Sequence, residues 1–363
     1  MPDCAAWPLP LTLEEITPEW LTRALRTRVQ EATVRGVEVV DVNNGTCTKV
    51  RLRLDLDEAG RAAGVPELVI LKGGFEPHSR AMAHVHLSEV RGYRDVFPYV
   101  PLPTPRCFFA DFSEEQQQGV VIMEDLCELG VEFCNAQRPQ AFDAVARRLS
   151  VLAEFHARTW NVDTAMGGRF ADFKEGELAL RTYMDQYLLK PEEWQRFVAS
   201  PRGAATSVHF HDLPKVIDRF DRLVAFSRRH PFCLTHGDTH LNNLFVFADG
   251  TPGFFDALPG KAPAMREVTY HLTCALDIAD RQRWDGALVQ HYLDALRGHG
   301  IAAPSFDEAM EQFAAFLLNG YIIFMVNESF YQPEAANTAY AARFSQAMID
   351  HRTMDVLAGV ALS

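Results

Sequence analysis

The sequence lacks the features by which several large classes of protein are recognised. Its seven cysteines include no Cys-x-x-Cys pair, which argues against a zinc ribbon or a thioredoxin-type redox site. It has no run of about 18 consecutive apolar residues, so no membrane-spanning helix is predicted. The first residues show no basic segment followed by an apolar run, so no signal peptide is predicted either. We therefore expect a protein of the reducing cytoplasm, where scattered thiols serve as small core residues.

Positive charge is also scarce. The chain has 35 Lys and Arg against 48 Asp and Glu, a formal net charge of -13, and no long basic run. Nucleic acids and anionic membranes are bound through clustered Lys and Arg. We therefore expect neither as a partner. Hydrophobic residues make up 48% of the chain and charged residues 23%, which is the composition of a folded globular protein.

The predicted secondary structure changes character along the chain. Strand patterns occupy 34–42, 49–56, 68–72 and 119–123, with helical patterns at 18–28 and 80–97. Helical patterns then occupy 139–160, 178–198, 214–230, 265–298 and 307–328. A β-like stretch at 232–260 interrupts them. Strands followed by helices predict an α+β fold in two lobes. We expect an N-lobe of residues 1–125 and a helical C-lobe of residues 126–363.

One block of sequence carries a chemical pattern. Residues 236–243 read HGDTHLNN, of the form H-x-D-x-x-x-x-N, and an apolar hairpin then leads to Asp256. Phosphoryl transfer requires a carboxylate that accepts or orients the proton of the attacking hydroxyl, and oxygen ligands that hold magnesium against the phosphates. The spacing therefore predicts Asp238 as the catalytic base, with Asn243 and Asp256 as ligands of Mg²⁺.

This block resembles the aminoglycoside phosphotransferase and choline kinase superfamily, and the first lobe is similar to its ecdysteroid-kinase-like branch. The resemblance implies a bilobal protein-kinase-like fold that binds ATP and Mg²⁺ between its lobes. It also implies that Lys72, at the end of an apolar strand, pairs with the ATP phosphates. Glu89, on the helix that follows, would ion-pair with Lys72, although Glu76 competes for that role.

The remaining nucleotide contacts have weaker signatures. The loop between the first two strands reads NNGTCT rather than G-x-G-x-x-G, and Gly45 and Thr46 are its candidate ATP-binding residues. A plain hairpin turn is the alternative interpretation. Glu124 occupies the position of the hinge that binds adenine through its backbone, and it is assigned by position alone.

The resemblance leaves three functions open. The first is phosphorylation of a hydroxyl on a small organic molecule, and the alternatives are a protein kinase and a nucleotide-binding scaffold without activity. The short connection after Asp256 favours a small acceptor over a peptide. Aromatic residues of the C-lobe could line an acceptor pocket or form helix core, and they are Tyr183, Tyr187, Trp194, Tyr321, Phe324 and Phe330. Asp277 and Glu328 could attract a cationic acceptor. The acceptor's identity and the oligomeric state stay unknown at this stage.

Overall fold

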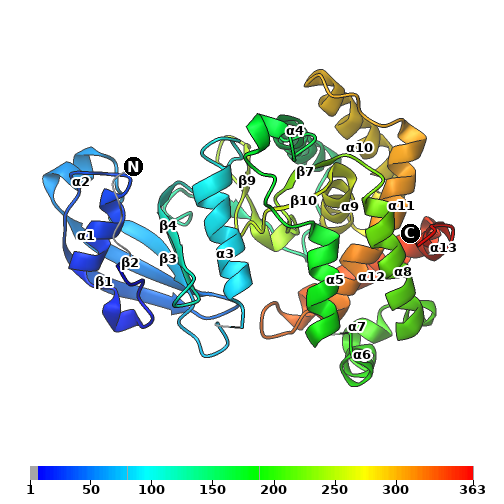
Figure 1. The fold of residues 1–363 in the computed structure, drawn as a ribbon, viewed down its shortest axis with the longest axis horizontal. Helices are drawn as coiled ribbons and strands as arrows, with labels where there is room; N and C mark the ends of the chain where they lie inside the picture. The colour runs from blue at the N-terminus through cyan, green and yellow to red at the C-terminus, as the bar shows by residue number, and fades with distance from the viewer. Residues whose placement is uncertain (1–6, 80, 188, 363) are drawn as a thin grey trace. The chain divides into compact units, whose positions relative to one another are not determined.

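The computed structural model describes residues 7–79, 81–187 and 189–362. The chain divides into two compact units (Figure 1). The first comprises Met1–Glu132 and Phe247–Leu258, and the second comprises Phe133–Val246 and Pro259–Ser363. The first unit is built on a β-sheet and the second is mainly helical, which confirms the predicted α+β fold class. The segment after Phe247, which the sequence-based division assigned to the C-lobe, groups with the first unit.

A five-stranded antiparallel sheet forms the first unit. Its order is β1-β2-β3-β5-β4, with strands Val34–Asn43, Thr48–Leu56, Leu68–Gly73, Gln118–Glu124 and Cys107–Ser113 respectively. The helical elements are η1 (Leu13–Glu15), α1 (Pro18–Arg26), α2 (Glu58–Ala62), α3 (Ala83–Arg91) and the π-helical turn η2 (Gly92–Val96). β9 (Pro252–Phe254) also belongs to this unit.

The two faces of the sheet have different side chains because successive residues of a strand alternate between them. On β2, Val50 and Leu52 are fully buried and join a core cluster with α1. α1 begins where Thr17 accepts a hydrogen bond from Trp20 N, with Pro18 as its first residue. On the opposite face, α3 packs against β4 and β5. The charged residues of β2, Lys49 among them, point to this second face.

The second unit consists of helices around a short strand pair. The pair is β7 (Phe232–Thr235) and β10 (Gly260–Pro263), which are antiparallel. The helices are α4 (Phe142–Arg158), α5 (Gly176–Tyr187), α6 (Pro191–Val198), α7 (Pro201–Ala204), α8 (Leu213–Ser227), α9 (Ala264–Ala275), α10 (Ile278–Gly298), α11 (Phe306–Val326), α12 (Glu334–Asp350) and α13 (Thr353–Ala358). Shorter elements are β6 (Glu132–Phe133), η3 (Ala165–Gly168), η4 (Val208–Phe210), η5 (Leu241–Asn243) and β8 (Leu244–Val246).

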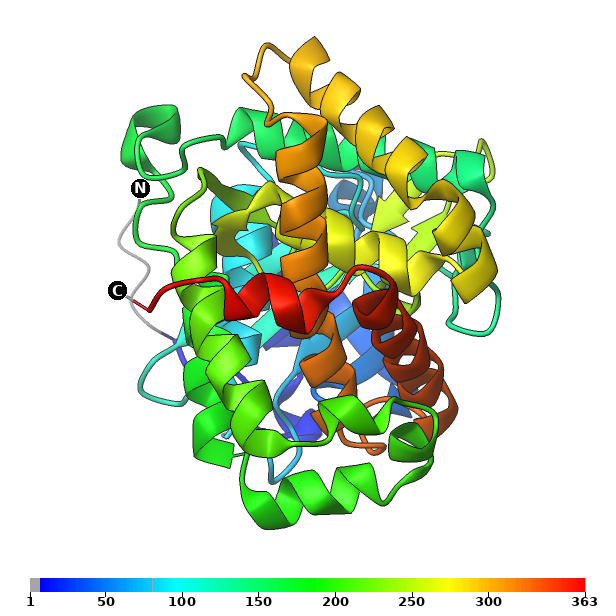
Figure 2. The same ribbon diagram turned by 90° about the vertical axis from the view of Figure 1, so that its right-hand side faces the viewer.

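α11 is the central helix of the second unit (Figure 2). It contacts α8, α9, α10, α12 and α13. By length and composition α11 could span a membrane, but 83% of its apolar window is buried inside the structure. A helix that is apolar on all sides is expected where it is surrounded by other helices. α11 thus serves as the core of this unit.

The crossing of α11 and α12 gives a test of this packing. A Cβ added at Gly320 would lie 2.1 Å from Cζ of the buried Phe344 ring. Gly320→Ala should therefore lower the free energy of unfolding by about 1–3 kcal/mol, the usual cost of overpacking. Denaturant unfolding followed by circular dichroism measures this.

Gly286→Ala is the matched control, because its added Cβ meets its nearest neighbour, Phe306, at an ordinary 3.5 Å. Alanine is the better helix former, so this variant should be neutral or more stable by up to about 1 kcal/mol. Equal effects of the two substitutions would contradict the close packing at Gly320.

Candidate functional site

Four charged side chains of the first unit meet in one cluster, which we call the Asp256 cluster. Lys72 Nζ contacts Glu89 Oε1 and lies 2.6 Å from Asp256 Oδ1. A second lysine, Lys49, places its Nζ 3.1 Å from Asp256 Oδ2. The structure thus brings together three residues that the sequence predicted and adds Lys49, which it did not.

Backbone geometry explains how the cluster forms. The register of β2 and β3 sets Lys49 directly opposite Lys72, and α3 brings Glu89 to the same face of the sheet. Asp256 follows β9 and has a φ of 55°, in the left-handed region that residues other than glycine seldom adopt. Strained conformations of this kind cost about 1–3 kcal/mol and are concentrated at functional sites.

The two lysines dominate the electrostatics of Asp256. Burial alone would raise the pKa of the Asp256 carboxyl, but the charges of Lys49 and Lys72 outweigh it and hold the pKa well below its usual range. The Asp256 carboxylate in turn raises the pKa of Lys49. Two ammonium groups and two carboxylates leave the cluster with a formal charge of zero.

The loop between β1 and β2 carries Gly45 and Thr46, and two histidines hold it. His78 Nε2 donates to Gly45 O at 2.9 Å, and His86 Nε2 lies 3.4 Å from Thr46 O. Gly45 is outside the left-handed region, so its conformation does not depend on glycine. His86 also lines a cavity beside Lys72 of about 10 Å³, about the size of one water molecule. The loop is therefore fixed through its carbonyl groups.

Glu124 ends β5 and is paired on two sides. Its backbone N–H donates to Arg106 O at 2.9 Å, and its carboxylate accepts from Arg106 N at 2.6 Å. The next residue, Asp125, is buried and accepts a 2.6 Å hydrogen bond from Arg51. The predicted hinge is thus held by its own two carboxylates, that of Glu124 bonded to the Arg106 backbone and that of Asp125 bonded to the Arg51 side chain.

The predicted catalytic loop lies between β7 and β8 in the second unit, where Asp238 and Asn243 are in contact. Asp238 Oδ1 accepts from the Tyr270 hydroxyl at 2.9 Å, and Oδ2 accepts from Asn243 Nδ2 at 2.9 Å. His240 Nε2 lies 3.4 Å from Oδ2. Burial alone would raise the pKa of Asp238, but the charge and hydrogen bond of His240, together with the Tyr270 hydroxyl, lower it. Asp238 is accordingly an ionised carboxylate at neutral pH.

Helix α9 anchors this loop through three side chains. Glu267 accepts from the backbone N–H groups of His236 at 3.0 Å and Gly237 at 2.8 Å, and His271 Nδ1 donates to Thr239 O at 3.0 Å. Tyr270 is the third, through its bond to Asp238. Gly237 has a φ of 90°, which glycine adopts without steric cost.

A buried histidine completes the anchor. His156 Nε2 donates to Glu267 Oε2 at 2.9 Å, while its Nδ1 accepts from the Tyr292 hydroxyl at 2.9 Å. Sequence reasoning missed Glu267 and Tyr270, but their spacing with His271, at i, i+3 and i+4, places all three on one face of a helix. That spacing on a predicted helix was the available signal.

A comparison with known protein families shows to which family this chain belongs. Residues 101–299, more than half of it, match the sequence model of the ecdysteroid kinase-like family. The chain belongs to this family. The predicted resemblance is thereby confirmed, and the family points to a small-molecule kinase. The matched region contains Asp238, Asn243 and Asp256 but begins after Lys72 and Glu89, so the case for those two residues rests on their geometry.

Solved structures give further likenesses. A choline/ethanolamine kinase family protein from Mesorhizobium loti is 12% identical, with 95% of this chain and 99% of that chain covered and a TM-score of 0.47. An amicoumacin kinase in complex with AMP-PNP and Ca²⁺ is 14% identical, with 86% and 88% covered and a TM-score of 0.49. A macrolide 2'-phosphotransferase from Brachybacterium faecium is 16% identical, with 88% and 97% covered and a TM-score of 0.44. No curated protein sequence matches significantly. The family assignment therefore rests on the sequence match.

The two predicted metal ligands of this ecdysteroid kinase-like protein belong to different units, Asp256 to the first and Asn243 to the second. Among the described residues, no group of three or more His, Cys, Asp or Glu could hold a metal ion. One carboxylate and one amide oxygen suit Mg²⁺, which usually takes few protein ligands and completes its coordination with phosphates and water. Each of the two donor types is thus one that Mg²⁺ accepts.

The candidate acceptor residues mostly have structural roles. Trp194, Tyr321 and Phe324 are buried in helix core, whereas Phe330 is 62% exposed. The Tyr187 side chain lies outside the described residues. Asp277 caps α10 by accepting from Asp280 N, and Glu328 pairs with Arg196. These contacts weaken the case that Asp277 and Glu328 attract a cationic acceptor.

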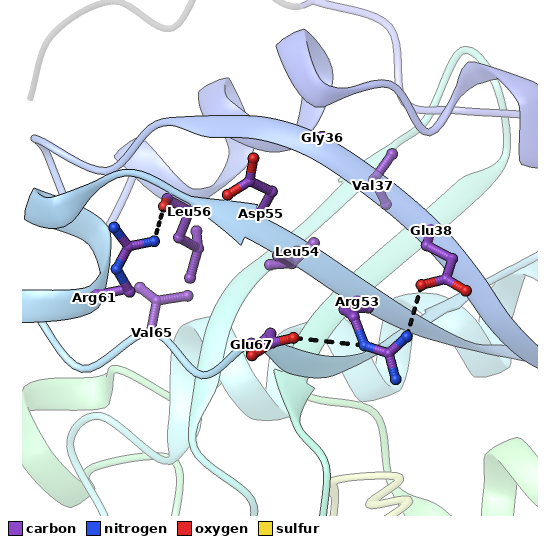
Figure 3. A pocket seen from close by; sticks show the side chains of 10 residues that line it. All are labelled: Gly36, Val37, Glu38, Arg53, Leu54, Asp55, Leu56, Arg61, Val65 and Glu67. Carbon is purple, nitrogen blue, oxygen red and sulfur yellow. Dashed lines mark hydrogen bonds and ion pairs between the residues drawn. The ribbon is translucent and has the colours of Figure 1, made fainter.

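An open surface hollow of about 650 Å³ lies elsewhere on the first unit, between β1, β2 and the segment around Val65 (Figure 3). Arg53 at its edge pairs with Glu38 at 2.7 Å and with Glu67 at 3.5 Å. Lys49 and Arg53 share a face of β2, but the hollow contains no residue of the Asp256 cluster. Arg53 and the two glutamates of the hollow are thus paired with one another, and Arg61 donates to the backbone carbonyl of Leu56.

The anchor on α9 predicts a pH-dependent stability. Burial alone would raise the pKa of Glu267, but hydrogen bonds from His156 and the loop backbone lower it. A carboxyl with a lowered folded pKa stabilises the fold above its unfolded pKa, about 4.3, and loses this effect as the pH falls through the folded value. Glu267→Gln should cost about 3 kcal/mol at pH 7, because an amide cannot accept all three bonds.

Denaturant unfolding from about pH 7 to about pH 3 checks this, and the gap between variant and wild type should narrow below about pH 4. The exposed Glu311→Gln on α11 is the control, with a change of no more than about 0.5 kcal/mol. A gap that is constant with pH would contradict the role of the Glu267 charge.

Proposed function

We propose that the protein is an ATP-dependent phosphotransferase that phosphorylates a hydroxyl group of a small organic molecule. The observation that carries this proposal is the Asp256 cluster. Lys72 and Asp256 are 184 positions apart in the sequence, yet their side chains are in contact together with Glu89. A lysine oriented by a helix carboxylate, next to a carboxylate suited to magnesium, is the arrangement that binds nucleotide phosphates in kinases.

Each side chain has a defined role in this proposal. Lys72 binds phosphate oxygens, and Glu89 holds it in position. Asp256 and Asn243 would hold Mg²⁺, which neutralises phosphate charge when it is bound. Asp238 orients the acceptor hydroxyl and receives its proton, with Tyr270 and Asn243 fixing the carboxylate. Positioning and charge account for most of the rate enhancement, because phosphoryl transfer requires little covalent chemistry from the protein.

The connection after Asp256 supports a small acceptor. β10 begins at Gly260 and α9 at Ala264, so only a few residues separate Asp256 from the next regular elements. A protein kinase uses a longer segment here to bind a peptide. A panel of aminoglycosides, macrolides, choline-like amines, sugars and sterols is the appropriate acceptor screen. The cytoplasmic location stays a prediction from the sequence.

Substitution of the base tests the chemistry. Asp238→Asn should leave the Kd for Mg-ATP nearly unchanged and lower kcat by about two to four orders of magnitude, because the amide cannot accept the proton. Steady-state kinetics with an acceptor from the screen measures kcat. Asp294→Asn, an exposed residue on α10, should retain the wild-type rate. An Asp238→Asn enzyme with wild-type turnover would remove Asp238 from the mechanism.

Substitution of Asp256 tests the proposed binding of the magnesium–nucleotide complex. Asp256→Ala should weaken Mg-ATP by about tenfold or more, because it removes an oxygen ligand of the cation. The same change leaves Lys49 and Lys72 without their shared partner, so the affinity for magnesium-free ATP should hold or rise. Isothermal titration calorimetry with magnesium or with a chelator separates the two cases. Equal losses in both conditions would assign Asp256 a structural role instead.

A further inference from the structure

We infer that Lys49 is a second phosphate-binding lysine of the nucleotide site, and that it occupies the metal-binding carboxylate of Asp256 when no nucleotide is bound. This inference rests on the proposed function and deepens it, because it assigns a residue outside the predicted site to the same ligand. Lys49 Nζ lies 3.1 Å from Asp256 Oδ2, and Lys72 Nζ lies 2.6 Å from Oδ1. Both oxygens of the carboxylate are therefore occupied by ammonium groups.

The placement of Lys49 fits a ligand contact better than a structural one. Its side chain is 40% exposed, whereas that of Lys72 is 4% exposed. An ion pair with so exposed a member adds little to stability, because solvent screens it. The Lys49 side chain lies directly opposite Lys72, the residue proposed to bind phosphate, in the β2–β3 register. A bound polyphosphate at Lys72 would thus be within reach of Lys49.

The choice of lysine supports this assignment. Lys49 and Lys72 are the two lysines of the first unit, which otherwise uses eleven arginines as its cations. The neighbouring cations on the same face of β2 are arginines, Arg51 and Arg53, and each pairs with carboxylates of its own. Lysine is a compact point charge on a flexible stem and can move between partners, whereas arginine favours a fixed, planar pairing. Both lysines of the unit meet at the one carboxylate expected to exchange partners.

Charge balance indicates the direction of the exchange. A divalent cation on Asp256 would repel two ammonium groups that contact the same carboxylate. Nucleotide phosphates supply an alternative anion for these groups. Lys49 therefore competes with the metal for Asp256 but contributes attraction to the nucleotide. Its removal should affect the two ligands in opposite directions.

Lys49→Met provides the test, because it keeps the length of the side chain and removes its charge. With the full-length protein, the Kd for Mn²⁺-ATP should rise about ten- to a hundredfold, the effect of losing a charged hydrogen bond. The Kd for Mn²⁺ alone should fall about two- to fivefold, as Asp256 loses a competing ion pair. Calorimetry measures the nucleotide, and electron paramagnetic resonance of free Mn²⁺ measures the metal. Lys49→Arg should retain part of the nucleotide affinity.

Arg53→Met is the matched control, because it removes a charge from the same face of the same strand and should leave both Kd values unchanged. Thermal unfolding confirms that each variant is folded, and Lys49→Gln replaces Lys49→Met if the latter is not. A Lys49 variant whose nucleotide Kd stays within twofold of the wild type overturns the inference, as does a weakening of both ligands. A wild-type protein that binds no nucleotide would instead refute the proposed function itself.

Discussion

The neutralisation of Asp256 by two lysines is the interaction on which the Asp256 cluster depends. The Asp256 carboxylate is partly buried, so its charge has to be balanced by neighbouring groups. Lys72 and Lys49 provide that balance from adjacent strands of the sheet. Glu89, on α3, is the second carboxylate of the cluster. The result is a cluster of four charged side chains with a formal charge of zero.

The loop of Asp238 in the second unit is held differently, through the buried carboxylate of Glu267. Glu267 is 1% exposed and accepts three hydrogen bonds, two of them from the backbone of the loop that presents Asp238. Tyr270 and Asn243 fix the Asp238 side chain directly. The role of base proposed for Asp238 requires such positioning, because a catalytic group has to be held within a fraction of an ångström to be effective. In the first unit the Asp256 cluster is thus held by ion pairs between side chains, and in the second unit the loop of Asp238 is held by hydrogen bonds from buried side chains.

Much of the fold was predictable, because most helices and strands have a recognisable pattern within their own short segment of sequence. The alternation in β2, the buried strand that ends at Lys72 and the H-x-D-x-x-x-x-N loop are all short patterns. The predicted helix 178–198 is instead two helices, since Pro191 begins a new one and restricts the residue before it. α12 was missed because it is buried on several sides and lacks a clear apolar stripe. Lys49 could not be recognised, since its partner lies 207 positions away and an alternating strand normally exposes its lysines.

The exchange of partners at Asp256 is the central claim, and a structure of the liganded protein tests it most directly. Crystals grown with Mn²⁺ and a non-hydrolysable ATP analogue would locate the metal by its anomalous scattering. The account predicts a manganese ion bound to the Asp256 carboxylate, with the ammonium groups of Lys49 and Lys72 moved onto phosphate oxygens. A structure with metal and nucleotide bound, but with both lysines still on Asp256, would contradict it.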